Sequence, residues 1–214
     1  MTTLNRSLLI GTASAMIALA SCGTPETPTP AAPTSDTSNA PEVVYNMDTA
    51  TSAVDWEGTM VGVKSHTGTL HFTTGELTEK GGALVGGSFT VDIRSYTFTD
   101  TNYAKPGSKQ GTRQNLMGHL MSPDFFAVDS FPTAQFTITS VSGNTATGDM
   151  TIRGHKNTEK VENISISADG KTIQATGDLT FNRQKYGVSW SSPMKDAVLS
   201  NDIVLKIVLK GTAK

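Results

Sequence analysis

Apolar and polar residues alternate with a period of two along several segments of this chain. In segment 89–94, Phe, Val and Ile alternate with Thr, Asp and Arg, and segments 136–139, 150–153, 179–182 and 203–210 follow the same pattern. Successive side chains of a β-strand point to opposite faces, so each segment predicts a strand with one apolar face. The pattern indicates an all-β fold.

Turn residues separate these strands. The chain contains 20 glycines, many of them between short Thr- and Val-rich runs, and this spacing predicts about eight antiparallel strands joined mostly by hairpins. Residues 154–157 predict one hairpin turn. A shift of the apolar positions between Phe72 and Leu77 predicts a β-bulge at Gly75. Eight strands close into a barrel whose interior is either filled or able to hold a small ligand, and a sandwich of two packed sheets is the alternative.

Segment 115–136 interrupts the strand pattern. It is rich in Leu, Met and Phe but contains Pro123 and Pro132, and proline interrupts both helices and strand ladders. We therefore expect a short helix over 108–121, a turn at 122–124, and then an aromatic segment, the plug, that closes one end of a hollow structure. The preceding segment 99–111, rich in Gly, Lys and Asn, predicts a loop beside the plug. A plain surface loop is the favoured interpretation, and a loop that gates a barrel mouth is the alternative.

The N-terminal region predicts a bacterial lipoprotein. Arg6 is the only charged residue before a short apolar run, 7–20, which ends in Leu19-Ala20-Ser21-Cys22. This run is shorter than a membrane-spanning helix and ends in small residues, as a cleaved signal does. A leucine and two small residues before a cysteine form a lipobox, so we expect 1–21 to be a lipoprotein signal peptide. An ordinary signal peptide with an incidental cysteine is the alternative.

In the lipoprotein interpretation Cys22, the only cysteine, carries the acyl groups that anchor the protein to a membrane. Residues 22–41 are then the acylated cysteine and a flexible Thr/Pro/Ser linker, and 42–214 form the β-barrel domain. By similarity to bacterial lipoproteins, the absence of Asp at position 23 favours the outer membrane, with the domain facing the periplasm.

An ordered set of motifs resembles the YceI-like family. In segment 119–132 a histidine–leucine pair is followed by serine, aspartate, two phenylalanines and a proline that enters a strand; further matches lie at 56–58, 66–68, 89–93, 148–154, 183–188 and 202–209. The resemblance implies a lipocalin-like barrel that holds a long isoprenoid or related lipid, with no established reaction, and it allows a homodimer. The family motif has an aspartate where this chain has Asn182, which puts any carboxylate role there in doubt, whereas Arg183 matches and is expected to brace the barrel.

Twelve apolar residues are the candidate ligand-binding residues, because they share the inward faces of the expected strands or belong to the plug. They are Phe89, Val91, Ile93, Phe125, Phe126, Phe136, Ile138, Leu179, Phe181, Ile203, Leu205 and Ile207. Spacing alone favours a solid core for these faces, whereas the family resemblance favours a tunnel.

Other chemistries have weaker support in the sequence. The net charge of −2 and the lack of a basic cluster give no support for nucleic-acid binding. His66 and His71 are five residues apart, so on a regular strand they point to opposite faces and do not share a metal. His119, near Ser122 and Asp124, has no strand–serine–helix elbow, and we expect these residues to satisfy and cap the loop. No metal site, cofactor or catalytic residue is therefore expected.

Three hypotheses follow from the sequence. The first is an envelope lipoprotein whose barrel binds, stores or transports a polyisoprenoid, quinone-like or other long-chain lipid. The second is a solid barrel that acts as a structural or interaction module for envelope proteins. The third is a lipid hydrolase or isomerase centred on His119. We rank them in this order and expect a binding protein rather than an enzyme.

Overall fold

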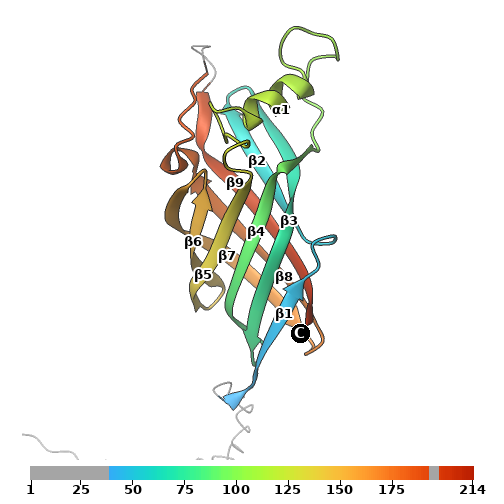
Figure 1. Ribbon diagram of the computed structural model, residues 1–214, viewed down its shortest axis with the longest axis vertical. Helices are drawn as coiled ribbons and strands as arrows, with labels where there is room; N and C mark the ends of the chain where they lie inside the picture. Colours follow the sequence, from blue (N-terminus) through green and yellow to red (C-terminus); the bar gives the residue numbers. More distant parts are fainter. Residues whose placement is uncertain (1–38, 193–197) are drawn as a thin grey trace, which may run out of the picture. The chain divides into compact units, whose positions relative to one another are not determined.

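A closed antiparallel β-barrel forms the described part of the chain, residues 39–192 and 198–214 of a computed structural model (Figure 1). Its strands are β1 (Glu42–Met47), β2 (Ala53–Val61), β3 (Lys64–Lys80), β4 (Ala83–Phe98), β5 (Thr133–Ser142), β6 (Thr145–Ile152), β7 (His155–Ala168), β8 (Thr172–Asn182) and β9 (Val198–Ala213). Helix α1 (Arg113–Met121) lies between β4 and β5, and a 3₁₀ turn, η2 (Arg183–Tyr186), follows β8. The expected signal peptide (1–21), Cys22 and the linker up to residue 38 lie outside the described residues.

The barrel closes because β1 and β2 together occupy one strand position. The ladder runs β2-β9-β8-β7-β6-β5-β4 and returns through β3 to β2. β2 pairs with the first half of β3 and most of β9, while β1 pairs with the last residues of both strands. The expected barrel of about eight strands is therefore confirmed. β1 is an extra strand that continues the position of the shorter strand β2 between β3 and β9.

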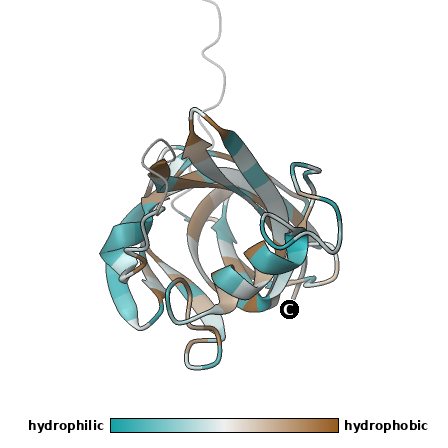
Figure 2. Cartoon of the chain, turned by 90° about the horizontal axis from the view of Figure 1, so that it is seen from above, coloured by the Kyte–Doolittle hydropathy of each residue, from teal (hydrophilic) through white to brown (hydrophobic). Residues whose placement is uncertain are grey.

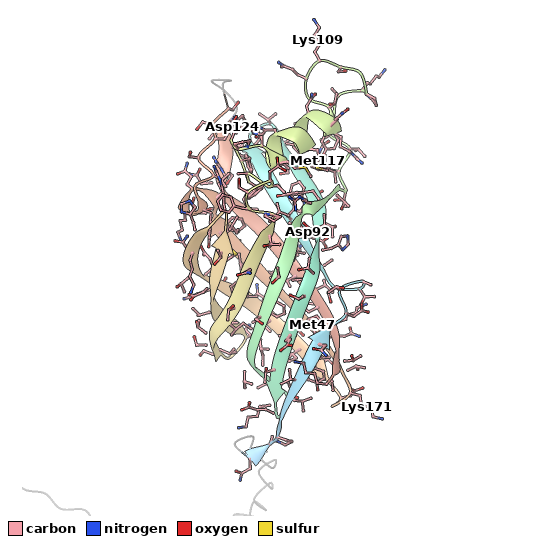
Figure 3. All side chains as sticks on the ribbon, viewed as in Figure 1. Met47, Asp92, Lys109, Met117, Asp124 and Lys171 are labelled. Carbon is pink, nitrogen blue, oxygen red and sulfur yellow. The ribbon has the colours of Figure 1, made fainter. Side chains whose placement is uncertain are left out.

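The period-two pattern sets which residues face the barrel interior. Along β6 and β8 every second residue is buried, and these positions include Ala146, Met150, Leu179 and Phe181. Viewed along the barrel, the strands surround a central interior, and α1 crosses one end (Figure 2). We call this end the helix end and the opposite one the β1 end. Met117 and Asp124 mark the helix end, and Met47 and Lys171 mark the β1 end (Figure 3).

Two details of the predicted strands and turns are wrong. The bulge on β3 lies at Thr73 and not at Gly75, because Phe72 pairs with Val91 and Thr74 with Thr90. The β6–β7 turn is Arg153–Gly154, both with positive φ (54° and 75°), as a two-residue type I′ turn requires. Residues 155–157 therefore belong to β7, and Asn157 does not form the turn: its side-chain amide donates to the Lys185 carbonyl at 3.1 Å.

The expected helix also starts later than the composition indicates. Thr112 caps its N-terminus: Thr112 Oγ1 accepts from the Asn115 N–H at 3.1 Å, and Asn115 Oδ1 accepts from the Thr112 N–H at 3.2 Å. This reciprocal capping box fixes the start of a helix. Gly111, directly before the cap, has a φ of 76° that is incompatible with a right-handed helix.

Among the described residues no helix is long and apolar enough to span a membrane.

Gly68 on β3 gives a first testable prediction for the fold. A Cβ at this position would overlap the Thr97 carbonyl oxygen and lie 2.7 Å from Cζ2 of Trp56. We expect Gly68→Ala to lower the free energy of unfolding by about 1–3 kcal/mol in urea denaturation, because a packed interior does not absorb an added methyl group without strain.

Gly118 provides the matched control for this substitution. It lies in α1, and a Cβ there would have no atom within 4 Å. Gly118→Ala should raise stability slightly, by up to about 1 kcal/mol, because alanine favours the helix. Equal effects of the two substitutions would contradict the packing at Gly68.

Candidate ligand-binding cavity

The barrel interior contains a cavity of about 270 Å³. An apolar cavity of about 150 Å³ is already large enough to bind benzene. Aliphatic and aromatic side chains from every strand from β2 to β9 line it, together with residues of α1 and the segment after it. Among the described lining residues there is no aspartate, glutamate or arginine. The cavity can therefore solvate a hydrocarbon but offers no carboxylate for acid–base chemistry.

All twelve candidate ligand-binding residues line this cavity. Phe125 and Phe126 reach it from the plug, and Phe89, Val91, Ile93, Phe136, Ile138, Leu179, Phe181, Ile203, Leu205 and Ile207 reach it from the strands. Their contact with a ligand stays a prediction. Their common orientation follows from strand alternation, which carries residues i, i+2 and i+4 to one face.

The sequence analysis did not include several residues that line the cavity among the candidate ligand-binding residues. They include Leu70, Phe72 and Leu77 of β3, Tyr96 of β4, Met150 of β6, and Trp56 and Trp190. The bulge at Thr73 shifts the parity of β3, so its inward residues do not follow a single alternating series. No local pattern marks Trp190, because it follows η2 and lies in no strand.

The plug at the helix end is buried as expected. Phe125, Phe126 and Val128 are 4%, 7% and 2% exposed. The plug is held by Arg153, whose Nη1 donates to the carbonyls of Phe125 (2.9 Å) and Gly187 (2.6 Å) and whose Nη2 donates to that of Pro123 (2.8 Å). One guanidinium thus ties the plug to the β6–β7 hairpin, a role that the sequence analysis did not assign.

Arg183 braces the same end from the other side. Only 2% exposed, it donates from Nε to the Ser200 carbonyl (3.0 Å) and from Nη1 to the carbonyls of Val188 (2.6 Å) and Trp190 (2.9 Å). Burial lowers the pKa of this guanidinium. Asn182 caps η2 by accepting from the Gln184 N–H at 2.9 Å. This contact needs only an oxygen acceptor, which the side-chain amide of Asn182 supplies as well as an aspartate would.

The loop 99–111 is fastened to β3 at its first residues. Asp100 accepts hydrogen bonds from Tyr103 Oη (2.6 Å), from the Thr67 N–H (3.0 Å) and from the Asn102 N–H (2.9 Å), and it lies 3.1 Å from His66 Nδ1. The rings of His66 and Tyr103 stack at 4.7 Å. Burial acts to raise the pKa of Asp100, but these hydrogen bonds outweigh it and hold the pKa at about 2. The loop is thus anchored where it leaves β4.

Asp100 gives a prediction with a defined sign. Because its pKa is about 2 in the folded protein, against an ordinary value of 3.8, the stability that it contributes is present above about pH 4 and lost as pH falls towards 2. Asp100→Ala should remove this part of the acid sensitivity. It should also speed hydrogen exchange at the amides of Thr67 and Asn102, as measured by mass spectrometry. Asp92→Ala, at a position without this network, is the control; unchanged exchange in Asp100→Ala would contradict the anchor.

Ser122 and two of the histidines, His119 and His155, have defined surroundings in the structure. Among the described residues no three His, Cys, Asp or Glu side chains are grouped to hold a metal. Ser122 Oγ donates to the His119 backbone carbonyl at 2.7 Å and ends α1, so its expected capping role is confirmed and it does not serve the imidazole. The His119 ring lines the cavity, and its Nε2 has no hydrogen-bond partner, so this nitrogen does not satisfy a loop backbone group. His155 is exposed as expected but lies in β7 and not in a turn.

The YceI-like domain model matches residues 45–211, which is nearly the whole described barrel. The chain belongs to the YceI-like family. A UPF0312 protein of Staphylococcus aureus (strain USA300) is 38% identical over 113 residues, which cover 49% of this chain and 65% of that protein. A second S. aureus UPF0312 protein, of strain bovine RF122, is 38% identical over 96 residues, or 41% of this chain and 53% of that one. The matches thus span about half to two thirds of these relatives.

Two solved structures share this fold. BcnA of Burkholderia cenocepacia aligns with a TM-score of 0.61 at 19% identity, covering 77% of this chain and 98% of that one. A polyisoprenoid-binding domain from Saccharophagus degradans aligns with a TM-score of 0.51 at 11% identity, covering 79% and 98%. At these identities the similarity establishes the architecture and leaves the ligand to be argued from this chain's own cavity.

Proposed function

We propose that this protein binds a long apolar lipid, of the polyisoprenoid or quinone type, inside its barrel, and that it stores or transports this lipid in the bacterial cell envelope. The observation that carries the proposal is the cavity of about 270 Å³ whose described lining has no carboxylate and no arginine. The name of the S. degradans neighbour, a polyisoprenoid-binding domain, supports the same ligand class.

The energetics favour retention of such a ligand. Each buried methylene contributes about 0.8 kcal/mol, so a five-carbon isoprene unit contributes roughly 3 kcal/mol before ordering costs. A few units suffice for tight binding without a charge–charge contact. An apolar lining selects a ligand by its length and shape. Among the described lining residues, the groups that can act as a general base at neutral pH are two histidines, His66 and His119. We therefore propose a carrier and not an enzyme.

Native mass spectrometry tests the ligand. The full mature chain with Cys22→Ser, secreted behind an ordinary signal peptide and purified without detergent, should show a mass excess that disappears on denaturation and fragments as an isoprenoid or fatty chain. A bare polypeptide mass that stays unchanged after incubation with polyprenols and quinones would refute the proposal. The barrel would then be the interaction module of the second hypothesis.

The envelope location is a separate part of the proposal. The lipobox-like segment 19–22 supports acylation of Cys22. β1, the strand that follows the linker, begins at the β1 end of the barrel, away from α1 and the plug (Figure 1). A tether at the β1 end would leave the helix end free to exchange lipid in the periplasm. Mass analysis of the N-terminal peptide from membrane-extracted protein should give an acylated Cys22. An unmodified N-terminus at another residue would contradict the proposed lipid anchor.

The homodimer that the family resemblance allows also stays a proposal. Light scattering on the same Cys22→Ser chain gives the molecular mass directly. A mass equal to one chain at micromolar concentration would exclude a stable dimer.

A further inference from the structure

Two buried polar atoms in the cavity wall have no hydrogen-bond partner. In the part of the chain that the structure describes, the buried side-chain atoms in this condition are Tyr45 Oη, Trp56 Nε1 and His119 Nε2. Trp56 and His119 line the cavity, whereas Tyr45 does not. A buried polar atom without a partner is costly, because it has lost its hydrogen bonds to water. In an otherwise apolar cavity, such atoms indicate where a ligand carries polar groups.

His119 is neutral in this environment. Its ring lies 4.7 Å from the Trp190 ring and 5.4 Å from the Phe125 ring. Burial lowers the pKa of its imidazole, and the charge of the exposed Asp124 only partly opposes this. A neutral imidazole carries one N–H and one lone pair. His119 can therefore either donate a hydrogen bond to a ligand oxygen or accept one from a ligand hydroxyl.

Trp56 belongs to the same end of the cavity. A continuous series of ring contacts leads from Phe125 to Phe126 (4.9 Å), from Phe126 to Tyr96 (6.0 Å) and from Tyr96 to Trp56 (5.4 Å). Trp56 is 8% exposed. Its indole N–H only donates, so a group that satisfies it must contain an acceptor oxygen.

Two basic residues, Lys64 and His66, line the cavity near this end. Lys64 Nζ donates to the Asn102 carbonyl at 2.8 Å, and His66 Nδ1 lies 3.1 Å from the Asp100 carboxylate. No arginine lines the described cavity. A phosphate or pyrophosphate head needs charged donors for burial. The described lining supplies a single ammonium, Lys64, for a phosphate that carries about two negative charges. Further from the helix end most lining residues are apolar, such as Leu77, Leu84 and Ile164, and Thr176 is also present there.

We propose that the cavity binds its lipid in one orientation, with the apolar chain towards the β1 end and a neutral oxygen-bearing head, a hydroxyl, phenol or carbonyl, at the helix end. The first oxygen of the head bonds to His119 Nε2, and a second oxygen, where the head has one, bonds to Trp56 Nε1. This proposal rests on the proposed lipid-binding function and makes it specific. His119 and Trp56 are then specificity-determining residues that favour a polyprenol- or quinone-like lipid over a prenyl phosphate or a pure hydrocarbon.

Three fifteen-carbon probes with the same chain test the proposal: farnesol, farnesyl phosphate and the hydrocarbon farnesene. The two tryptophans of the chain, Trp56 and Trp190, both line the cavity, so intrinsic fluorescence reports binding directly. In the full mature chain with Cys22→Ser, farnesol should bind about tenfold more tightly than farnesene, the effect of one hydrogen bond to an otherwise unpaired buried group. Farnesyl phosphate should bind more weakly than farnesol.

Variants at His119 identify the residue responsible. His119→Phe keeps an aromatic ring and should reduce the farnesol preference to about onefold without weakening farnesene. His119→Gln restores a polar group and should recover part of the preference, and it also serves if His119→Phe fails to fold. His71→Phe is the control, because His71 is exposed on β3 and does not line the cavity.

The outcomes separate this proposal from the one on which it rests. Equal binding of farnesol and farnesene, tighter binding of the phosphate, or an unchanged preference in His119→Phe would overturn the head-group proposal and leave lipid binding intact. Failure of all three probes to bind, together with the absence of copurified lipid, would overturn lipid binding itself.

Discussion

Replacement of Ala146 by phenylalanine is expected to abolish lipid binding while the barrel stays folded. Ala146 is fully buried on β6 and lines the cavity, so a benzyl group there occupies the space that the ligand would take. Displacement of one isoprene unit costs roughly 3 kcal/mol of binding free energy, or more than 100-fold in affinity. Copurified lipid, measured by mass spectrometry after organic extraction, should disappear.

The controls for this substitution separate cavity filling from misfolding. Ala175→Phe fills the cavity from β8, at a position that is 5% exposed and also lines the cavity, and it should have the same effect. Ser167→Phe adds a benzyl group on the outer side of β7, where Ser167 and its pairing partner Gln174 are both exposed, and it should leave lipid binding unchanged. Normal lipid content in folded Ala146→Phe and Ala175→Phe proteins would contradict binding in the barrel interior and favour the outer surface.

Substitution of Arg183 by methionine should cause the largest loss of stability. Its guanidinium is buried, and without it the carbonyls of Val188 and Trp190 lose the donor Nη1 and that of Ser200 loses Nε. A buried carbonyl left without a hydrogen-bond partner costs about 1–3 kcal/mol, so the loss of these three partners should lower the free energy of unfolding by about 3 kcal/mol or more. Urea denaturation should show a loss of this size.

Arg183→Lys should lose most of this stability as well, because a single ammonium group cannot reproduce the planar fork of donors. Arg94→Met is the matched control, since Arg94 is exposed on β4, and surface substitutions usually change stability by less than about 0.5 kcal/mol. A loss below about 1 kcal/mol in Arg183→Met would mean that water satisfies these carbonyls and that Arg183 does not brace the helix end.

The sequence predicted the strands and the inward residues of the barrel well, because both depend on local geometry. Strand alternation has a period of two wherever the pairing is regular, so residues such as Phe136 and Ile138 could be assigned to one face without a structure. The same reasoning failed where the geometry is irregular. The bulge at Thr73 and the tight turn at Arg153–Gly154 depend on how two strands pair. The sequence of one strand alone does not determine its register with the neighbouring strand.

The sequence by itself therefore determined the all-β class, the approximate number of strands, the plug, and which faces are apolar. Only the tertiary structure decided that this interior keeps a cavity of about 270 Å³ and is not fully packed, because cavity size depends on how side chains from distant strands meet. It also decided that the His119 ring lines the cavity and that Arg153 and Arg183 hold the helix end. These contacts join residues from separate elements, and no local spacing of residues encodes them.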